Sequence, residues 1–186
     1  MKRFTSILKP ALLCFVILML LCGVVYTGAV TGVAQLMFPN EANGSVIAVT
    51  LKDGSKKEYG SRLIAQEFTK PEYLIGRPLG TTNLSPTSAE QKALVQERID
   101  WWHAFDLDNS TEIPLDLVTA SGSGVDPHIT PEAAEYQVKR IAAARGIEEE
   151  AVRGIIREYT KGRFLGVFGE RAVNVLEVNL ALDGLL

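Results

Sequence analysis

The chain has 186 residues, of which 47% are hydrophobic and 22% charged, and its formal net charge at pH 7 is −3. Three of its 19 Lys and Arg residues precede residue 10, but none of its 22 Asp and Glu residues does, so the charge after that point is −6. This mildly acidic balance argues against nucleic acid and against docking on anionic lipid. The length after residue 40 suffices for one sizeable hydrophobic core and is short for two.

A long uncharged run occupies the first part of the chain, from Pro10 to Asn40. A helix rises about 1.5 Å per residue and the hydrocarbon core of a bilayer is roughly 30 Å thick, so about 20 residues suffice to cross it. A helix also satisfies its backbone N–H and C=O groups internally, as lipid requires. Residues 10–38 are therefore predicted to form one transmembrane helix.

The orientation of this helix follows from the charges that flank it. Lys2, Arg3 and Lys9 precede it, and no acidic residue occurs before Glu41. The positive-inside rule then predicts that residues 1–9 form a cytoplasmic tail. Residues 39–186 are predicted to be extracytoplasmic, at the cell inner (plasma) membrane.

Two alternatives use the same apolar run differently. A cleaved signal peptide would have a shorter apolar region and a small-x-small site, for which Gly32-Val33-Ala34 is a candidate. The second alternative is a lipoprotein with Cys22 as the lipidated residue. The sequence supports it less well than a signal peptide, because bulky Leu21 stands where a small residue is needed. Both cysteines, Cys14 and Cys22, lie within the run, so the exported domain is predicted to depend on its core without a disulfide.

The predicted anchor contains a small-xxx-small pair, Gly28 and Gly32, on one helix face. Such a face allows another helix to approach closely, so that dispersion contacts replace contacts with lipid. Glycine is also simply common in membrane helices. Contact with a partner helix and this plainer interpretation both remain open.

The first half of the exported region shows signals for a hairpin and a helix. Val46 to Leu51 is predicted to be a strand, with Asp53-Gly54 as the turn and Lys56 to Tyr59 as the return strand. Arg77 to Ser88 is rich in Gly, Thr, Ser and Pro and is predicted to be a loop. Ser88 followed by Gln91 is a capping-box pattern that opens a helix to about Phe105. The apolar face of that helix consists of Val95, Ile99 and Trp102.

The second half shows two further helices between two apolar runs. Ile113 to Thr119 is predicted to be a short buried strand. Thr130-Pro131-Glu132 opens a helix that runs to Arg145 and that Gly146 closes. A second helix is predicted from about Glu148 to Tyr159. Val173 to Leu182 alternates in polarity and is predicted to be the final strand. The fold class is therefore α+β: a single N-terminal transmembrane helix followed by one extracytoplasmic α+β domain.

The loop Ser121-Gly122-Ser123-Gly124 invites a comparison with phosphate-binding loops. It lacks the P-loop spacing, and Pro127 follows where the dinucleotide fingerprint requires its third glycine. Its backbone N–H groups could form a small anion nest. A turn that leads into the capped helix explains the glycines equally well, and this second interpretation is favoured.

A serine hydrolase is the most specific enzyme alternative that the sequence suggests. Ser121 or Ser123 lies close in sequence to Asp126 and His128, and a histidine can act as base to a serine. The G-x-S-x-G elbow is absent, however, and crowding along one short loop rarely permits triad geometry. Asp126 and His128 are more consistent with shaping the turn before the helix.

The stretch from Leu117 to Ala134, LVTASGSGVDPHITPEAA, resembles the C subunit of the bacterial Kdp-type, high-affinity potassium-transporting ATPase. Supporting segments occur along almost the whole chain: Lys9-Pro10-Ala11, Phe38-Pro39, Ala42 to Ser45, Gly60-Ser61, Leu63-Ile64, Gln66, Gly76-Arg77-Pro78, Tyr136 to Arg145 and Val173 to Leu182. Two departures are visible. Tyr26-Thr27 stands where the family usually has Tyr-Pro, and the loop after Arg77-Pro78 is shorter than usual.

The resemblance implies a non-catalytic, single-pass subunit of a multi-subunit complex. Its implied partners are a potassium-channel subunit and a P-type ATPase subunit, beside the lipid bilayer. No cofactor is implied to bind this chain directly; ATP and potassium are handled by the complex. The family is also described as a catalytic chaperone that raises the nucleotide affinity of the ATPase subunit. An exported domain cannot touch cytoplasmic ATP, so we expect such an influence to be coupling through the complex.

The expected function is therefore that of an accessory subunit that supports assembly and coupling; a membrane-anchored serine hydrolase and an anchored solute-binding module are the alternatives. The candidate partner-contact residues are Gly28, Gly32, Arg77, Pro78, Ser121, Gly122, Ser123, Gly124, Asp126 and His128.

Overall fold

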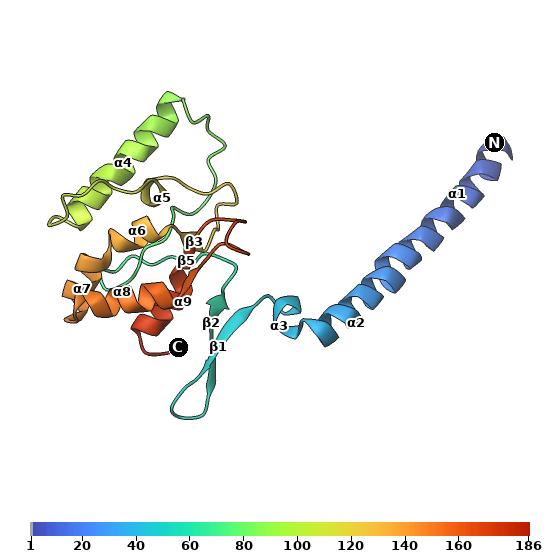
Figure 1. Cartoon of the computed structure of the whole chain (residues 1–186). Coiled ribbons are helices and arrows are strands. Elements are labelled where there is room, and N and C mark those ends of the chain that lie inside the picture. The colour runs from blue at the N-terminus through green and yellow to red at the C-terminus, as the bar shows by residue number, and fades with distance from the viewer. Residues whose placement is uncertain (1) are drawn as a thin grey trace. The chain divides into compact units, whose positions relative to one another are not determined.

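The computed structural model describes residues 2–186, which divide into two compact units with the boundary after Val46 (Figure 1). The first unit is almost entirely helical: α1 (Lys2–Leu20), a π-helical turn η1 (Leu21–Tyr26), α2 (Thr27–Met37) and the short α3 (Pro39–Ala42). The segment Ser6–Met37 is the one candidate membrane span among the described residues, with a mean hydropathy of 2.5. The side chains of Lys2 and Arg3, which contribute to the predicted orientation, lie outside the described part.

The anchor helix starts earlier than the predicted Pro10, which lies inside α1. It ends at Met37, one residue before the predicted end at residue 38. The π-helical turn is accompanied by a hydrogen bond in which Thr27 Oγ1 donates to the Cys22 carbonyl oxygen at 2.8 Å. Wider turns of this kind are rare in helices and often occur at functional positions.

The second unit contains, apart from Val46, the hairpin of β1 (Val46–Thr50) and β2 (Lys56–Ser61), as predicted. A second, three-stranded sheet has the order β3 (His128–Ile129), β5 (Ala172–Asn174), β4 (Thr160–Lys161), and both pairings are antiparallel. In its register His128 pairs with Asn174, and Thr160 pairs with Val173. This small sheet joins segments that are distant in the sequence.

Six helices surround these strands: α4 (Ala89–Phe105), α5 (Leu115–Val118), α6 (Pro131–Glu135), α7 (Val138–Arg145), α8 (Glu149–Glu158) and α9 (Val175–Leu182). In Figure 1, α5 lies beside α4, and α7 and α8 pack side by side near α9. The main core is built from all of these helices and includes Leu74, Trp102, Val138, Ile141, Val152 and Val178.

The capping predictions are confirmed: Ser88 Oγ accepts from Gln91 N at 3.1 Å, Thr130 Oγ1 accepts from Ala133 N at 3.2 Å, and Gly146 closes α7 in the left-handed conformation.

The final apolar run is helical, so the prediction of a strand from Val173 to Leu182 is wrong beyond Asn174. The Asn174 side chain accepts from Glu177 N at 3.0 Å and thereby caps α9. Residues 175–180 are all buried, and a helix buried on every side has no polar face from which its period can be read.

Two smaller predictions are also wrong. Residues 115–118, expected within a strand, form the single turn α5, which follows Pro114 and in which Thr119 Oγ1 donates to the Leu115 carbonyl oxygen. Pro114 has no N–H to offer a strand partner. The helix expected from Thr130 to Arg145 is broken between α6 and α7. The Gln137 side chain donates to the Ala133 carbonyl oxygen, which the Gln137 backbone N–H would use in an unbroken helix.

Candidate functional site

A segment that is neither helix nor strand, residues 71–78, crosses the helices of the second unit and is held by buried side-chain amides. Asn179 of α9 accepts from Leu74 N at 2.7 Å and donates to the Leu74 carbonyl oxygen at 2.9 Å. Gln137 accepts from Ile75 N at 2.8 Å and donates to the Ile75 carbonyl oxygen at 2.9 Å. The two amides replace the hydrogen bonds of a neighbouring strand and fix the segment that leads to Arg77.

Two arginines of α7 bind the carbonyl oxygens at the start of this segment. Arg140 donates to Pro71 and Tyr73, and its burial lowers its pKa to about 10. Arg145 donates to the Glu72 carbonyl oxygen at 2.7 Å and to the Leu182 carbonyl oxygen at 2.6 Å. Both guanidinium groups therefore hold the backbone next to the cleft described below, and their N–H groups are used in hydrogen bonds within the domain.

Arg77, a predicted contact residue, forms an ion pair with Asp116 of α5. The second carboxylate oxygen of Asp116 accepts from Thr130 N at 2.7 Å, at the residue that caps α6. Asp116 is buried, and the Arg77 side chain is only 23% exposed. Arg77 therefore connects three segments of the domain, while Pro78 beside it lines the cleft.

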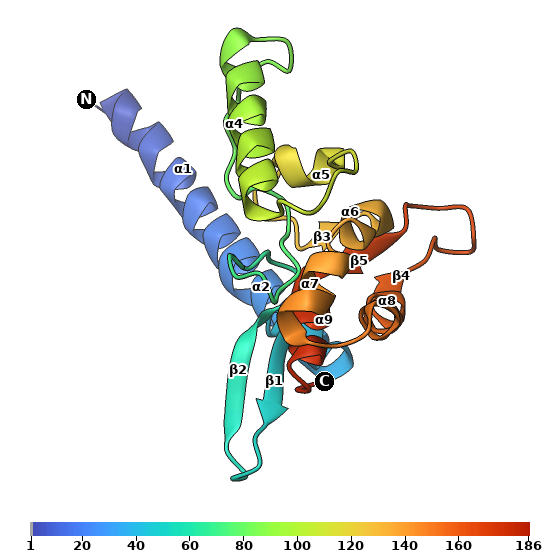
Figure 2. The same ribbon diagram turned by 90° about the vertical axis from the view of Figure 1, so that its left-hand side faces the viewer.

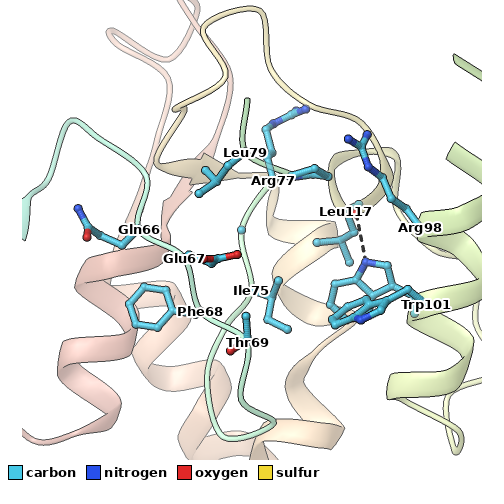
Figure 3. Close-up of a pocket in the computed structure, with 13 residues that line it drawn as sticks. Gln66, Glu67, Phe68, Thr69, Ile75, Arg77, Leu79, Arg98, Trp101 and Leu117 are labelled. Carbon is cyan, nitrogen blue, oxygen red and sulfur yellow. Dashed lines mark hydrogen bonds between the residues drawn. The ribbon is translucent and has the colours of Figure 1, made fainter. Parts of the chain in front are cut away.

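A cleft of about 370 Å³ opens along the segment next to α4 (Figure 3). Arg98 and Trp101 reach it from α4, and Glu67 and Phe68 lie on the opposite side. Trp101 is 44% exposed, and its ring stacks on Phe105 with the ring centroids 4.6 Å apart. The cleft is thus a half-apolar surface with charged side chains on both sides.

Arg98 also borders a second hollow of about 430 Å³, whose other lining residues include 81–84, 86 and 119–122. Arg98 Nη1 donates to the Val118 carbonyl oxygen at 2.9 Å, and burial lowers the pKa of its guanidinium. Among the described residues, Arg98 is the only Lys or Arg that lines this second hollow. One arginine is a poor cradle for a nucleotide triphosphate, whose phosphates require several donors.

The loop Ser121–Gly124 is held by hydrogen bonds between its own residues and by contact with residues 80–81. Ser121 Oγ accepts from Gly124 N at 3.0 Å, and Ser123 Oγ accepts from Val125 N at 3.2 Å. Two of the N–H groups near this loop are therefore engaged, which weakens the anion-nest interpretation. The Gly124 carbonyl oxygen accepts from Gly80 N at 2.8 Å. Gly122 faces open space, so a Cβ there would meet nothing within 4 Å.

Asp126 and His128 interact with each other. Asp126 Oδ1 accepts from His128 N at 3.0 Å and lies 3.4 Å from His128 Nδ1. The hydroxyls of Ser121 and Ser123 lie 3.2 Å apart. In the part of the chain that the structure describes, no hydrogen bond joins either serine to His128, so the geometry provides no support for a hydrolase triad.

The two anchor glycines lie one turn apart in α2. A Cβ built on Gly28 or on Gly32 meets no heavy atom within 4 Å, so this face is open within the described chain. Asp116, Gln137 and Asn179 organise this part of the domain and were not predicted as site residues. For two of them the usable signal was a polar residue inside an apolar run: Asp116 stands between Leu115 and Leu117, and Asn179 between Val178 and Leu180. Gln137 has no such signal, because charged residues lie two positions before and after it.

The fold defines a class of protein: one apolar anchor helix followed by a mixed helix-and-sheet domain, the arrangement of a single-pass membrane subunit. Comparison with known proteins narrows this class. The family model described as "K+-transporting ATPase, c chain" matches residues 8–184.

Curated relatives match over almost their whole length. The potassium-transporting ATPase KdpC subunit of Listeria welshimeri is 56% identical over 188 residues, covering 100% of this chain and 99% of that protein. The subunits of the same name from Clostridium perfringens (46% over 200 residues, 97% of this chain and 98% of that protein) and Clostridium botulinum (44% over 205 residues, 100% of both) are also similar. The chain therefore belongs to the family of the C chain of K+-transporting ATPases.

Proposed function

We propose that the chain is a non-catalytic accessory subunit of an ATP-driven potassium import complex, which supports assembly and coupling of a potassium-channel subunit and a P-type ATPase subunit. The observation that carries this proposal is the family match over residues 8–184, together with one apolar anchor helix. The site supports it as well. Arg77 is paired with Asp116, Arg98 donates to a backbone carbonyl oxygen, and Asp126 accepts from the backbone of His128, as in a structural scaffold.

In this proposal the N-terminus is cytoplasmic and the α+β domain is extracytoplasmic, because all charges before the anchor are positive. The anchor face of Gly28 and Gly32 is open to a partner helix. The cleft and the loop Ser121–Gly124 are surfaces available to the channel subunit. Any influence on the ATP affinity of the ATPase subunit is transmitted through the complex, as a coupling free energy between distant sites.

Co-purification tests the proposal. The full-length tagged chain is purified from its native membrane in mild detergent, and we expect a channel subunit and a P-type ATPase subunit to accompany it. The KM for ATP of the complex, measured with and without this chain, then tests the coupling. Recovery of the tagged chain alone from every detergent would reject the assignment to a complex.

Labelling of a single cysteine tests the orientation. Cys14 and Cys22 are the only cysteines, so Cys14→Ala and Cys22→Ala give a background without thiols. Glu170→Cys, at a side chain that is 82% exposed, should react with an impermeant maleimide on intact cells. Lys2→Cys is the matched control and should react only after permeabilisation. The reverse pattern would place the domain in the cytoplasm and make direct contact with ATP credible.

A further inference from the structure

The turn between β4 and β5 carries four large apolar side chains in solvent. Phe164, Leu165, Val167 and Phe168 are 64–76% exposed, and every residue from 161 to 171 is exposed. Both views show this loop projecting from the helices of its domain (Figures 1 and 2). A Cβ built on any of its three glycines meets nothing within 4 Å. We call residues 164–168 the apolar tip.

The apolar tip has a defined conformation. Phe164 N donates to the Phe168 carbonyl oxygen at 2.8 Å, and Phe168 N donates to the Phe164 carbonyl oxygen at 2.9 Å. An ion pair of 2.8 Å between Arg163 and Glu170 closes the neck of the loop. Leu165, at φ 52°, and Gly166, at φ 75°, both have positive φ. A positive φ is energetically unfavourable for leucine. The stability of the turn therefore does not by itself explain why a leucine occupies position 165.

Exposed apolar side chains on a preordered turn are typical of a binding surface. A turn that is already ordered loses little conformational freedom on binding, and aromatic side chains that fill a pocket supply much of the affinity of an interface. Lys161 and Arg171 flank the tip, and neither takes part in an ion pair among the described residues. The surface is therefore apolar at its centre and positive at its edge.

This chemistry fits a protein pocket better than a lipid surface. The chain after residue 10 carries a charge of −6, which opposes approach to anionic lipid. A fixed arrangement of two phenylalanines complements a shaped pocket, whereas lipid requires no particular shape. We propose that the apolar tip inserts into an apolar pocket, rimmed by carboxylates, on another subunit of the same transporter. This inference rests on the proposed function and adds the place of contact.

Photocrosslinking in the assembled complex tests the contact. Phe164 is replaced by p-benzoylphenylalanine in the full-length chain, which is expressed with its partner subunits and irradiated in native membranes. We expect one protein adduct, with another subunit of the transporter. Leu107, which is 84% exposed on a different loop, is replaced in the same way as the matched control and should give no such adduct.

Charge and apolar variants test the stated chemistry of the pocket. Lys161→Glu with Arg171→Glu should lower the yield of the Phe164 adduct several-fold, as should Phe168→Ser, whereas Leu115→Ser, at another exposed leucine, should leave it unchanged. An adduct only with lipid, only with a second copy of this chain, or with no molecule while the complex still co-purifies would overturn the inference and leave the proposed function intact. Failure of the unmodified chain to co-purify with any subunit would instead reject the proposed function.

Discussion

Asn179 and Leu74 are joined by two hydrogen bonds, one to the backbone N–H and one to the carbonyl oxygen of Leu74, at 2.7 and 2.9 Å. Both residues are at most 1% exposed. The pair connects the last helix, α9, to the segment of residues 71–78, which carries Arg77 and Pro78. It therefore determines where one wall of the cleft lies.

Replacing Asn179 with Leu should lower the free energy of unfolding of the domain by about 2–4 kcal/mol, because two buried backbone groups of Leu74 would lose their partners. Denaturant unfolding of the purified full chain in detergent measures the change. Gln96→Ala, at an exposed amide on α4, is the control and should stay within about 0.5 kcal/mol of the unmodified chain. Equal stability of both variants would contradict the role of the Asn179–Leu74 pair.

The ion pair of Arg77 and Asp116 should behave as a coupled unit. Arg77→Met alone should destabilise the domain by about 3 kcal/mol, since it leaves a buried carboxylate without its cation. Asp116→Asn in addition should recover part of that loss, because the uncompensated charge is removed. A double-mutant cycle measured by unfolding gives the coupling energy, and additive single effects would show that the pair is not coupled.

Gly124→Ala should be destabilising, by about 1–3 kcal/mol. The φ of Gly124 is +71°, and a Cβ there would lie 2.8 Å from the carbonyl carbon of Gly80. Gly122→Ala is the matched control in the same loop, because Gly122 has open space around it. Thermal unfolding of the two variants should therefore differ; a smaller effect at Gly124 than at Gly122 would show that the contact with Gly80 is unimportant.

Stability should fall in alkali partly through Tyr73. Its hydroxyl donates to Asp183 Oδ2 at 2.9 Å, and this hydrogen bond raises the pKa of Tyr73 above 10.0. The folded chain then keeps the proton at a pH at which the unfolded chain has lost it. This contribution is fully present below pH 10 and is lost as the pH rises through the folded pKa. Unfolding between about pH 9 and 11 should show a shallower decline in Tyr73→Phe and in Asp183→Ala than in the unmodified chain. Identical slopes would contradict the assignment.

The glycine face of the anchor should matter for assembly and leave the fold of the α+β domain unchanged. Gly28→Leu with Gly32→Leu should reduce the amount of partner subunit that co-purifies in detergent, because leucine side chains hold a neighbouring helix away. Gly23→Leu is the control, since Gly23 also has open space around it but lies outside that pair. Unchanged co-purification of the double variant would count against this contact.

Several elements could be predicted from the sequence because their signals are local. The caps of Ser88 and Thr130 each join residues three positions apart, and Gly146 ends α7 through its own backbone freedom. The hairpin β1–β2 is likewise specified by a turn between two short strands. Such signals remain readable because they do not depend on distant residues.

The candidate site could be predicted only in part. Arg77 and Pro78 do lie at the cleft, and the loop Ser121–Gly124 borders the neighbouring hollow. Arg98 and Trp101 were overlooked as site residues, because their place on α4 becomes meaningful only when the segment of residues 71–78 lies opposite. Whether the candidate residues contact a partner stays a prediction.

The anchor could be predicted from the sequence alone, because an uncharged run of that length is stable as a helix in lipid. The helix caps, the hairpin and the family could be predicted in the same way. The helix of residues 175–182 became evident only from the packing of the folded chain, since burial on all sides removes the contrast between polar and apolar faces. The same is true of the hydrogen bonds of Asn179 with Leu74 and of Gln137 with Ile75, which join residues 105 and 62 positions apart in the chain. Contacts of that range depend on how the helices pack, which no local pattern records.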